Sequence, residues 1–76
     1  MLTNEEVKVL SYMRGHHYAS AAEVARACLP GASLDWVARV VSNLDWLGHL
    51  ATYHSPDGRL AALQITEKGL CKPVAD

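Results

Sequence analysis

Four side chains suited to recognition stand on one stretch of the sequence, within residues 33–49. Spacings of three, four and three residues place them on one side of a helix: Trp36, Arg39, Asn43 and Trp46. Arg and Asn are the residue types that hydrogen-bond guanine and adenine edges in the major groove of DNA. Trp and Arg are also enriched at the energetic centres of protein interfaces. The same four residues therefore suit duplex DNA and a protein partner.

Each tryptophan has two interpretations that the sequence leaves open. In the plainer one, Trp46 packs into the edge of the core, under a hairpin or against the first helix, and Trp36 is likewise a packing residue. In the other, both indoles are exposed and flank Arg39 and Asn43 on the surface.

The histidines and cysteines form no motif for metal binding. His16 and His17 are adjacent, so their side chains point to different faces, and His49 and His54 stand five residues apart. We expect structural or solvated histidines, with His54 able to reach a phosphate, and a core position for Cys28. No nucleophile–base pair, phosphate-binding loop or carboxylate pair stands out. The sequence therefore predicts neither an enzyme nor a metal or cofactor site.

Length and composition indicate a single globular domain over residues 1–76, with an ordered core at about residues 3–71. Of 76 residues, 50% are hydrophobic and 20% are charged, a balance typical of folded proteins. The longest apolar run, residues 60–63, is far too short for a membrane span. The first residues lack the basic and apolar regions of a signal peptide. With only two cysteines, a cytoplasmic protein is expected.

Charge is nearly balanced along the chain. The net charge is −1, and residues 33–49 also carry a net charge of −1, because this segment contains one arginine and two aspartates. Affinity for duplex DNA comes largely from neutralised phosphates. One copy of the chain offers few cations for that purpose, and a two-fold homodimer would double the number.

Two capping boxes predict where the first helices begin, at Thr3 with Glu6 and at Ser20 with Glu23. Apolar spacing predicts a first helix over residues 4–14, which Gly15 ends in the left-handed conformation. A short extended stretch follows at residues 16–19. The second helix is short and ends before residues 29–32.

The third helix is predicted over residues 34–47, capped by Ser33 and ended by Gly48, with a wide apolar stripe of period 3.6. The pattern then changes to strands at residues 50–54 and 59–65, joined by the turn sequence Ser-Pro-Asp-Gly. One helical turn is expected at residues 66–70, and a loose tail beyond residue 72.

Three local phrases carry a resemblance to a known family. Residues 20–27, Ser-Ala-Ala-Glu-Val-Ala-Arg-Ala, look like the second helix of a helix-turn-helix. Residues 44–50, Leu-Asp-Trp-Leu-Gly-His-Leu, look like the exit of a recognition helix. Residues 64–69, Gln-Ile-Thr-Glu-Lys-Gly, look like the strand that closes a wing. Together they resemble winged helix-turn-helix regulators of the MarR and PadR type, over about residues 4–70.

The resemblance implies a mainly α fold of three helices and a two-stranded wing, and a small DNA-binding regulator. In that family the third helix lies in the major groove and the wing contacts backbone or minor groove. An alternative from another class is a protein-interaction winged helix, such as an adaptor subunit or a small inhibitor anchored by its tryptophans. The residues predicted to contact DNA or a partner are Ser33, Trp36, Arg39, Ser42, Asn43, Trp46, Arg59 and Lys68.

Overall fold

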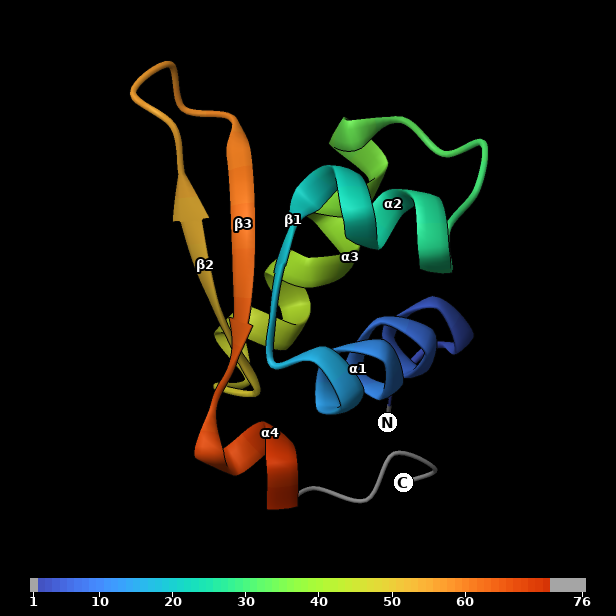
Figure 1. The fold of residues 1–76 in the computed structure, drawn as a ribbon, viewed down its shortest axis with the longest axis vertical. Coiled ribbons are helices and arrows are strands. Elements are labelled where there is room, and N and C mark those ends of the chain that lie inside the picture. Colours follow the sequence, from blue (N-terminus) through green and yellow to red (C-terminus); the bar gives the residue numbers. More distant parts are fainter. Residues whose placement is uncertain (1, 72–76) are drawn as a thin grey trace.

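The computed structural model describes residues 2–71, which form four helices and three strands (Figure 1). In chain order they are α1 (Asn4–His16), β1 (Tyr18–Ser20), α2 (Ala21–Cys28), α3 (Leu34–Trp46), β2 (Leu50–His54), β3 (Leu60–Ile65) and α4 (Glu67–Cys71). The loose tail predicted beyond residue 72 lies outside the described residues. Within residues 2–71, every helix is too short or too polar to cross a membrane.

α1 begins at the predicted capping box and continues past its predicted end. The Thr3 hydroxyl accepts from the Glu6 amide at 3.2 Å, and the Thr3 amide donates to Glu6 Oε1 at 2.8 Å. The left-handed conformation predicted for Gly15 is wrong, because Gly15 lies inside the helix and His17 takes φ 66° instead. The His17 amide donates to the Met13 carbonyl at 2.7 Å, which extends the helical bonding beyond the glycine.

The other two helix starts follow the same local chemistry. The Ser20 hydroxyl accepts from the Glu23 amide at 3.1 Å, which confirms the second capping box. α3 begins behind its Ser33 cap and ends at Trp46, one residue before its predicted end. Gly48 follows with φ 87° and turns the chain into β2.

The stretch after α1 is a strand of the sheet, whose order is β1-β3-β2 with both pairs antiparallel. β2 and β3 form the predicted hairpin, and the Gly58 amide donates to the Ser55 carbonyl at 2.9 Å in its turn. β1 pairs with β3 through Tyr18 opposite Gln64. The sequence predicted the extended stretch without its partner strand.

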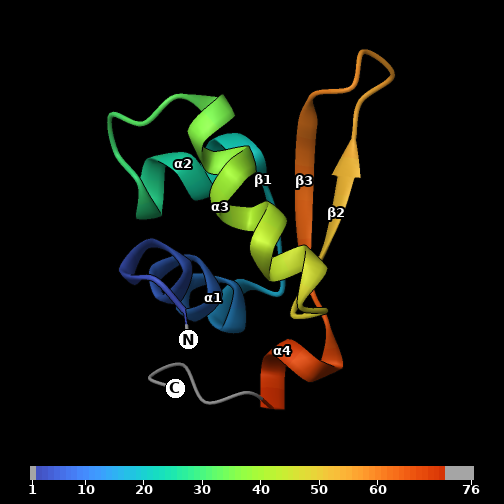
Figure 2. The same ribbon diagram turned by 180° about the vertical axis from the view of Figure 1, so that it is seen from behind.

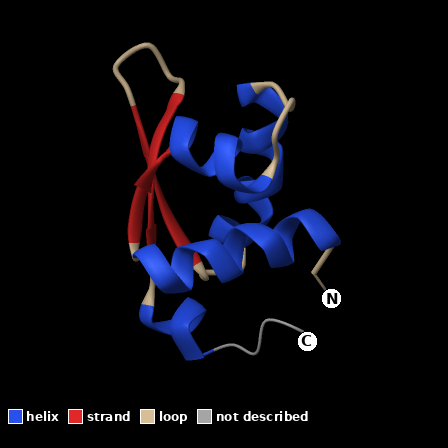
Figure 3. Cartoon of the chain, turned by 45° about the vertical axis from the view of Figure 1, so that its right-hand side comes forward, coloured by secondary structure: helices blue, strands red, loops and turns tan. Residues whose placement is uncertain are grey.

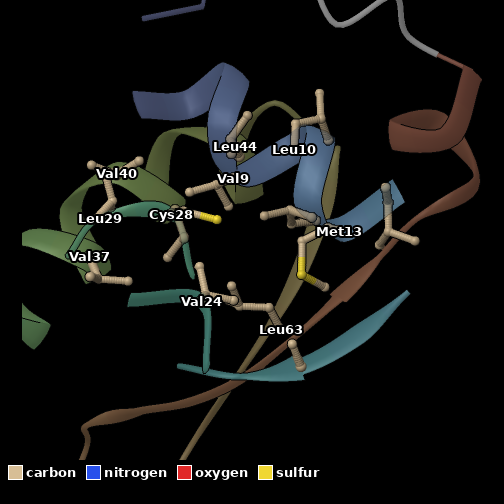
Figure 4. Packing of buried hydrophobic residues seen from close by; sticks show 14 residues of the cluster. Val9, Leu10, Met13, Val24, Cys28, Leu29, Val37, Val40, Leu44 and Leu63 are labelled. Carbon is tan, nitrogen blue, oxygen red and sulfur yellow. The ribbon is translucent and has the colours of Figure 1, made fainter. Parts of the chain in front are cut away.

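α1, α2 and α3 cover one face of this sheet and enclose the core (Figures 3 and 4). Buried core side chains come from α1, α2, α3 and all three strands, and include Val9, Leu10, Met13, Ala19, Val24, Cys28, Val37, Val41, Leu44, Leu50, Leu63 and Ile65. Cys28 lies among them, as predicted, with its thiol donating to the Lys8 carbonyl at 3.7 Å. Burial raises the pKa of the Cys28 thiol, and the nearby Lys8 charge opposes that change.

α4 is fixed to the ends of α1 and α3 by side chains that bond main-chain carbonyls. Arg14 Nε donates to the Gly69 carbonyl at 3.0 Å, and Lys68 Nζ donates to the Leu47 carbonyl at 2.7 Å. A Cβ at Gly69 would overlap the His49 carbonyl oxygen. Close approach of the two backbones therefore requires glycine at position 69.

Candidate nucleic-acid interface

α3 buries one face in the core and exposes the opposite one. Val37 and Leu44 are fully buried, whereas Arg39 is exposed. Trp46 is 83% exposed and Trp36 is 46% exposed. The interpretation of Trp46 as a core-edge residue is therefore wrong, because the buried stripe of α3 ends at Leu44 and the last turn carries the indole outward.

The hairpin stands beside α3 and presents an arginine near its tip (Figure 2). Arg59 Nε lies 3.7 Å from Asp57 Oδ2, the one ion pair found within residues 2–71. Asp57 also accepts hydrogen bonds from the Ser55 hydroxyl and from the Arg59 amide, and these bonds lower the pKa of its carboxyl. The Arg59 guanidinium thus lies near the Asp57 carboxylate and stays open to solvent.

A cleft of about 470 Å³ separates the first turns of α3 from the hairpin. Its walls are Ser33, Leu34, Asp35, Ala38, His54, Gly58, Arg59 and Leu60. The start of α3 and the wing arginine thus border the same hollow, although Ser33 and Arg59 lie 26 positions apart in the sequence.

Two predicted contact residues, Asn43 on α3 and Ser33 just before it, form hydrogen bonds within the fold. The Asn43 side chain donates from Nδ2 to Glu6 Oε2 at 2.7 Å. The Ser33 hydroxyl caps the helix by accepting from the Trp36 amide at 3.2 Å. Both side chains hold α3 in place, one against α1 and one at its own start.

Lys68 lies away from the hairpin tip, at the other end of the molecule (Figure 1). Its ammonium donates to the Leu47 carbonyl, just past the end of α3. A cation there stabilises the negative end of the helix dipole. The structure thus separates Lys68 from the surface that holds Arg39 and Arg59.

Charges of both signs share the exposed surface of α3 and the hairpin. The arginines at positions 39 and 59 stand with three aspartates, Asp35, Asp45 and Asp57. Asp45 accepts from the Thr52 hydroxyl of β2 at 2.9 Å. Such a balance limits the attraction of one copy for phosphate. Sequence reasoning missed the Asp57–Arg59 pair, although a two-residue spacing across a tight turn was the visible signal.

Of the four histidines, His49 is buried, and His16, His17 and His54 are exposed. His16 stacks on Tyr12 with ring centroids 3.9 Å apart, and His49 is buried. His54 lines the cleft between α3 and the hairpin. No three His, Cys, Asp or Glu side chains gather for a metal ion within residues 2–71.

Comparison with known proteins finds similarity in structure. No family model and no curated protein matches this chain. The solved structure of BpsR from Bordetella bronchiseptica, a protein whose DNA binding is regulated by 6-hydroxynicotinic acid, is 26% identical with a TM-score of 0.73. The match covers 90% of this chain and 51% of BpsR.

Two further solved structures are similar over the same share of this chain. PcaV from Streptomyces coelicolor, a transcriptional regulator solved with its natural ligand, is 28% identical with a TM-score of 0.72, covering 90% of this chain and 48% of PcaV. A MarR variant from E. coli, solved with operator DNA, is 19% identical with a TM-score of 0.70, covering 90% and 48%. This chain spans about half the length of these proteins. The similarities confirm the predicted winged-helix fold and the resemblance to MarR-type regulators.

Proposed function

We propose, from this winged-helix fold and its likeness to MarR-type regulators, that the chain binds duplex DNA as the DNA-binding unit of a transcriptional regulator. The observation that carries the proposal is the exposed face of α3, with Arg39 upon it, beside a wing that presents the exposed Arg59 near its tip. A MarR variant with the same fold is solved on its operator. Such a regulator works where the DNA is, so a cytoplasmic location follows from the proposal.

In this proposal α3 enters the major groove. The groove is about 12 Å wide and admits one helix, and the 13 residues of α3 extend about 20 Å at 1.5 Å per residue. Arg39 hydrogen-bonds a guanine edge, because it is a long, exposed hydrogen-bond donor on the outer face of α3. Ser42 bonds a neighbouring base edge, and the Trp36 ring contacts a thymine methyl group.

The wing supplies a contact to the sugar–phosphate backbone. From its exposed position near the hairpin tip, Arg59 reaches a phosphate or the minor groove. Ser33 and Asn43 act by holding α3, and Lys68 acts by closing its far end. The structural neighbours are regulators, and they do not favour the adaptor or inhibitor alternative.

Selection from a pool of random duplexes of about 20 base pairs, followed by anisotropy titration, tests the proposal. Arg39→Ala is expected to cost about 1–3 kcal/mol on the selected sequence and to relax preference at one base pair. Arg59→Ala is expected to weaken binding to all sequences and to reduce the salt slope by about 0.9.

The matched control is Lys8→Ala, which removes the same unit of charge from an exposed position on α1. Lys8→Ala is expected to bind as the unsubstituted chain does. Failure to select any duplex at low salt contradicts the proposal. Equal losses for Lys8→Ala and Arg59→Ala contradict the assigned surface.

A further inference from the structure

Three aspartates stand on the exposed surface of α3 and the hairpin, and two of them are hydrogen-bonded within the fold. Asp45 accepts from a hydroxyl of β2 at 2.9 Å, and Asp57 accepts from two donors of the hairpin. Asp35 is exposed in the first turn of α3, and no hydrogen bond or ion pair of its carboxylate is found within residues 2–71. The Asp35 carboxylate therefore retains its full capacity to accept hydrogen bonds.

Asp35 lies where a recognition helix meets base edges. It is the second residue of α3, and the N-terminal residues of a recognition helix contact bases in the major groove. The cleft between α3 and the hairpin has both Asp35 and Arg59 in its walls. The hairpin tip and the first turn of α3 lie toward the same end of the molecule (Figures 1 and 2). In the proposed docking, Asp35 therefore enters the groove with the start of α3.

A carboxylate in that position needs a hydrogen-bond donor on the DNA. The phosphates are negatively charged and repel it. In the major groove the donors are the amino groups of cytosine, at N4, and adenine, at N6, and adenine also presents its acceptor N7. Because an ionised carboxylate only accepts, cytosine is the base that suits it. We propose that Asp35 accepts from cytosine N4 and so selects a C·G base pair, an inference that rests on the proposed function.

Arg39 stands four residues after Asp35 and extends the inference to a second base. Residues four apart lie on the same side of a helix, and four residues advance about 6 Å along its axis. Neighbouring base pairs lie about 3.4 Å apart, so the two side chains reach base pairs one or two steps apart. Asp35 and Arg39 form no ion pair with each other within the described structure, so each can contact its own base. The expected site holds a cytosine and a guanine within about two base pairs.

A carboxylate at the start of a helix has a second role, because it stabilises the positive end of the helix dipole. That role depends on charge and is indifferent to the DNA sequence. Exchange of the Asp35 carboxylate for an amide of the same shape separates the two roles. Asn hydrogen-bonds adenine through N6 and N7. A residue that reads a base therefore changes the preferred base, whereas a residue that only stabilises the helix leaves it unchanged.

Selection from random duplexes with each variant, followed by anisotropy titration, tests the proposal. The unsubstituted chain is expected to bind its selected duplex about five-fold or more tighter than a duplex with A·T in place of the C·G pair. Asp35→Asn is expected to reverse this preference, with adenine in place of cytosine, and to keep the guanine read by Arg39. Asp35→Ala is expected to bind the two duplexes equally.

Asp45→Asn is the matched control, because it removes the same charge from the last turn of α3. It is expected to keep the preference for cytosine, and circular dichroism verifies that each variant is folded. An unchanged base preference in Asp35→Asn and Asp35→Ala overturns the inference and keeps the proposed function.

Two other results also overturn the inference and keep DNA binding. One is an equal change of preference in Asp45→Asn, which would be an effect of charge alone. The other is loss of the guanine preference in Asp35→Asn with the cytosine retained, which would make Asp35 a positioning residue for Arg39. Failure of the unsubstituted chain to select any duplex at low salt overturns the proposed function, and this inference with it.

Discussion

Asn43→Ala is expected to lower stability while leaving base preference unchanged. The side chain donates to Glu6 Oε2 at 2.7 Å, and the same carboxylate accepts from the Thr3 amide through Oε1. Glu6 is only 5% exposed, so water does not readily replace the lost donor. Asn43 thus joins α3 to the start of α1.

The magnitude follows from the type of bond removed. A hydrogen bond to a charged group contributes about 1.5–3 kcal/mol. We expect Asn43→Ala to reduce the free energy of unfolding by about 2 kcal/mol, which for a domain of this size lowers Tm by about 8–16 °C. Ser42→Ala is the matched control, because Ser42 is the exposed neighbour on the same helix, and a change within about 0.5 kcal/mol is expected.

Urea unfolding followed by circular dichroism measures both variants. A double-mutant cycle with Glu6→Ala is expected to give a coupling energy of about 1–2 kcal/mol. The reasoning is refuted if Asn43→Ala is no less stable than Ser42→Ala, or if the cycle gives no coupling. Altered base preference in Asn43→Ala at full stability would return Asn43 to the reading surface.

Further predictions concern the glycines at positions 15 and 69, the Cys28 thiol and the two tryptophans. Gly15→Ala is expected to raise the free energy of unfolding by about 0.5–1 kcal/mol, because Gly15 is helical and an added Cβ would meet open space. Gly69→Ala is expected to lower the free energy of unfolding by about 1–3 kcal/mol, because the added Cβ would overlap a main-chain carbonyl. Thermal melts that rank these two in the opposite order would contradict the structure. The pKa of the buried Cys28 thiol is raised above 9.0, so the unfolded chain ionises first, and stability is expected to hold below about pH 8 and to fall above pH 9. Unfolding across pH should show this fall, and Cys28→Val should remove it. On DNA addition, the fluorescence of Trp36 is expected to change more than that of Trp46, as single Trp→Phe variants would report; the reverse order contradicts the proposed docking.

Local chemistry made much of the fold predictable. Both capping boxes and the Ser33 cap use residues three positions apart, so the sequence alone contains the interaction. The hairpin likewise follows from turn residues between two short strands. The end of α1 was not predictable in this way. It depends on the bond from the His17 amide to the Met13 carbonyl, which continues the helix past Gly15.

Contacts between segments far apart in the sequence could not be predicted from it. Pairing of β1 with β3 joins residues more than 40 positions apart. The three residues of β1 are too few for their sequence pattern to predict the partner strand. The bond from Asn43 to Glu6 depends on how α3 crosses α1. Exposure of Trp46 depends on which elements reach the last turn of α3. The residue types indicated a recognition surface. The structure was needed to show that Asn43 and Lys68 form hydrogen bonds within the fold, whereas Arg39 and Arg59 are exposed.

The salt dependence of binding to a selected duplex tests the central claim most directly. If α3 and the wing dock on DNA, log K falls linearly with log salt concentration, with a slope of about −0.9 for each phosphate contacted. Each copy that places Arg59 on one phosphate adds about −0.9 to this slope. A slope near zero, or no measurable binding at low salt, would contradict DNA recognition by this surface.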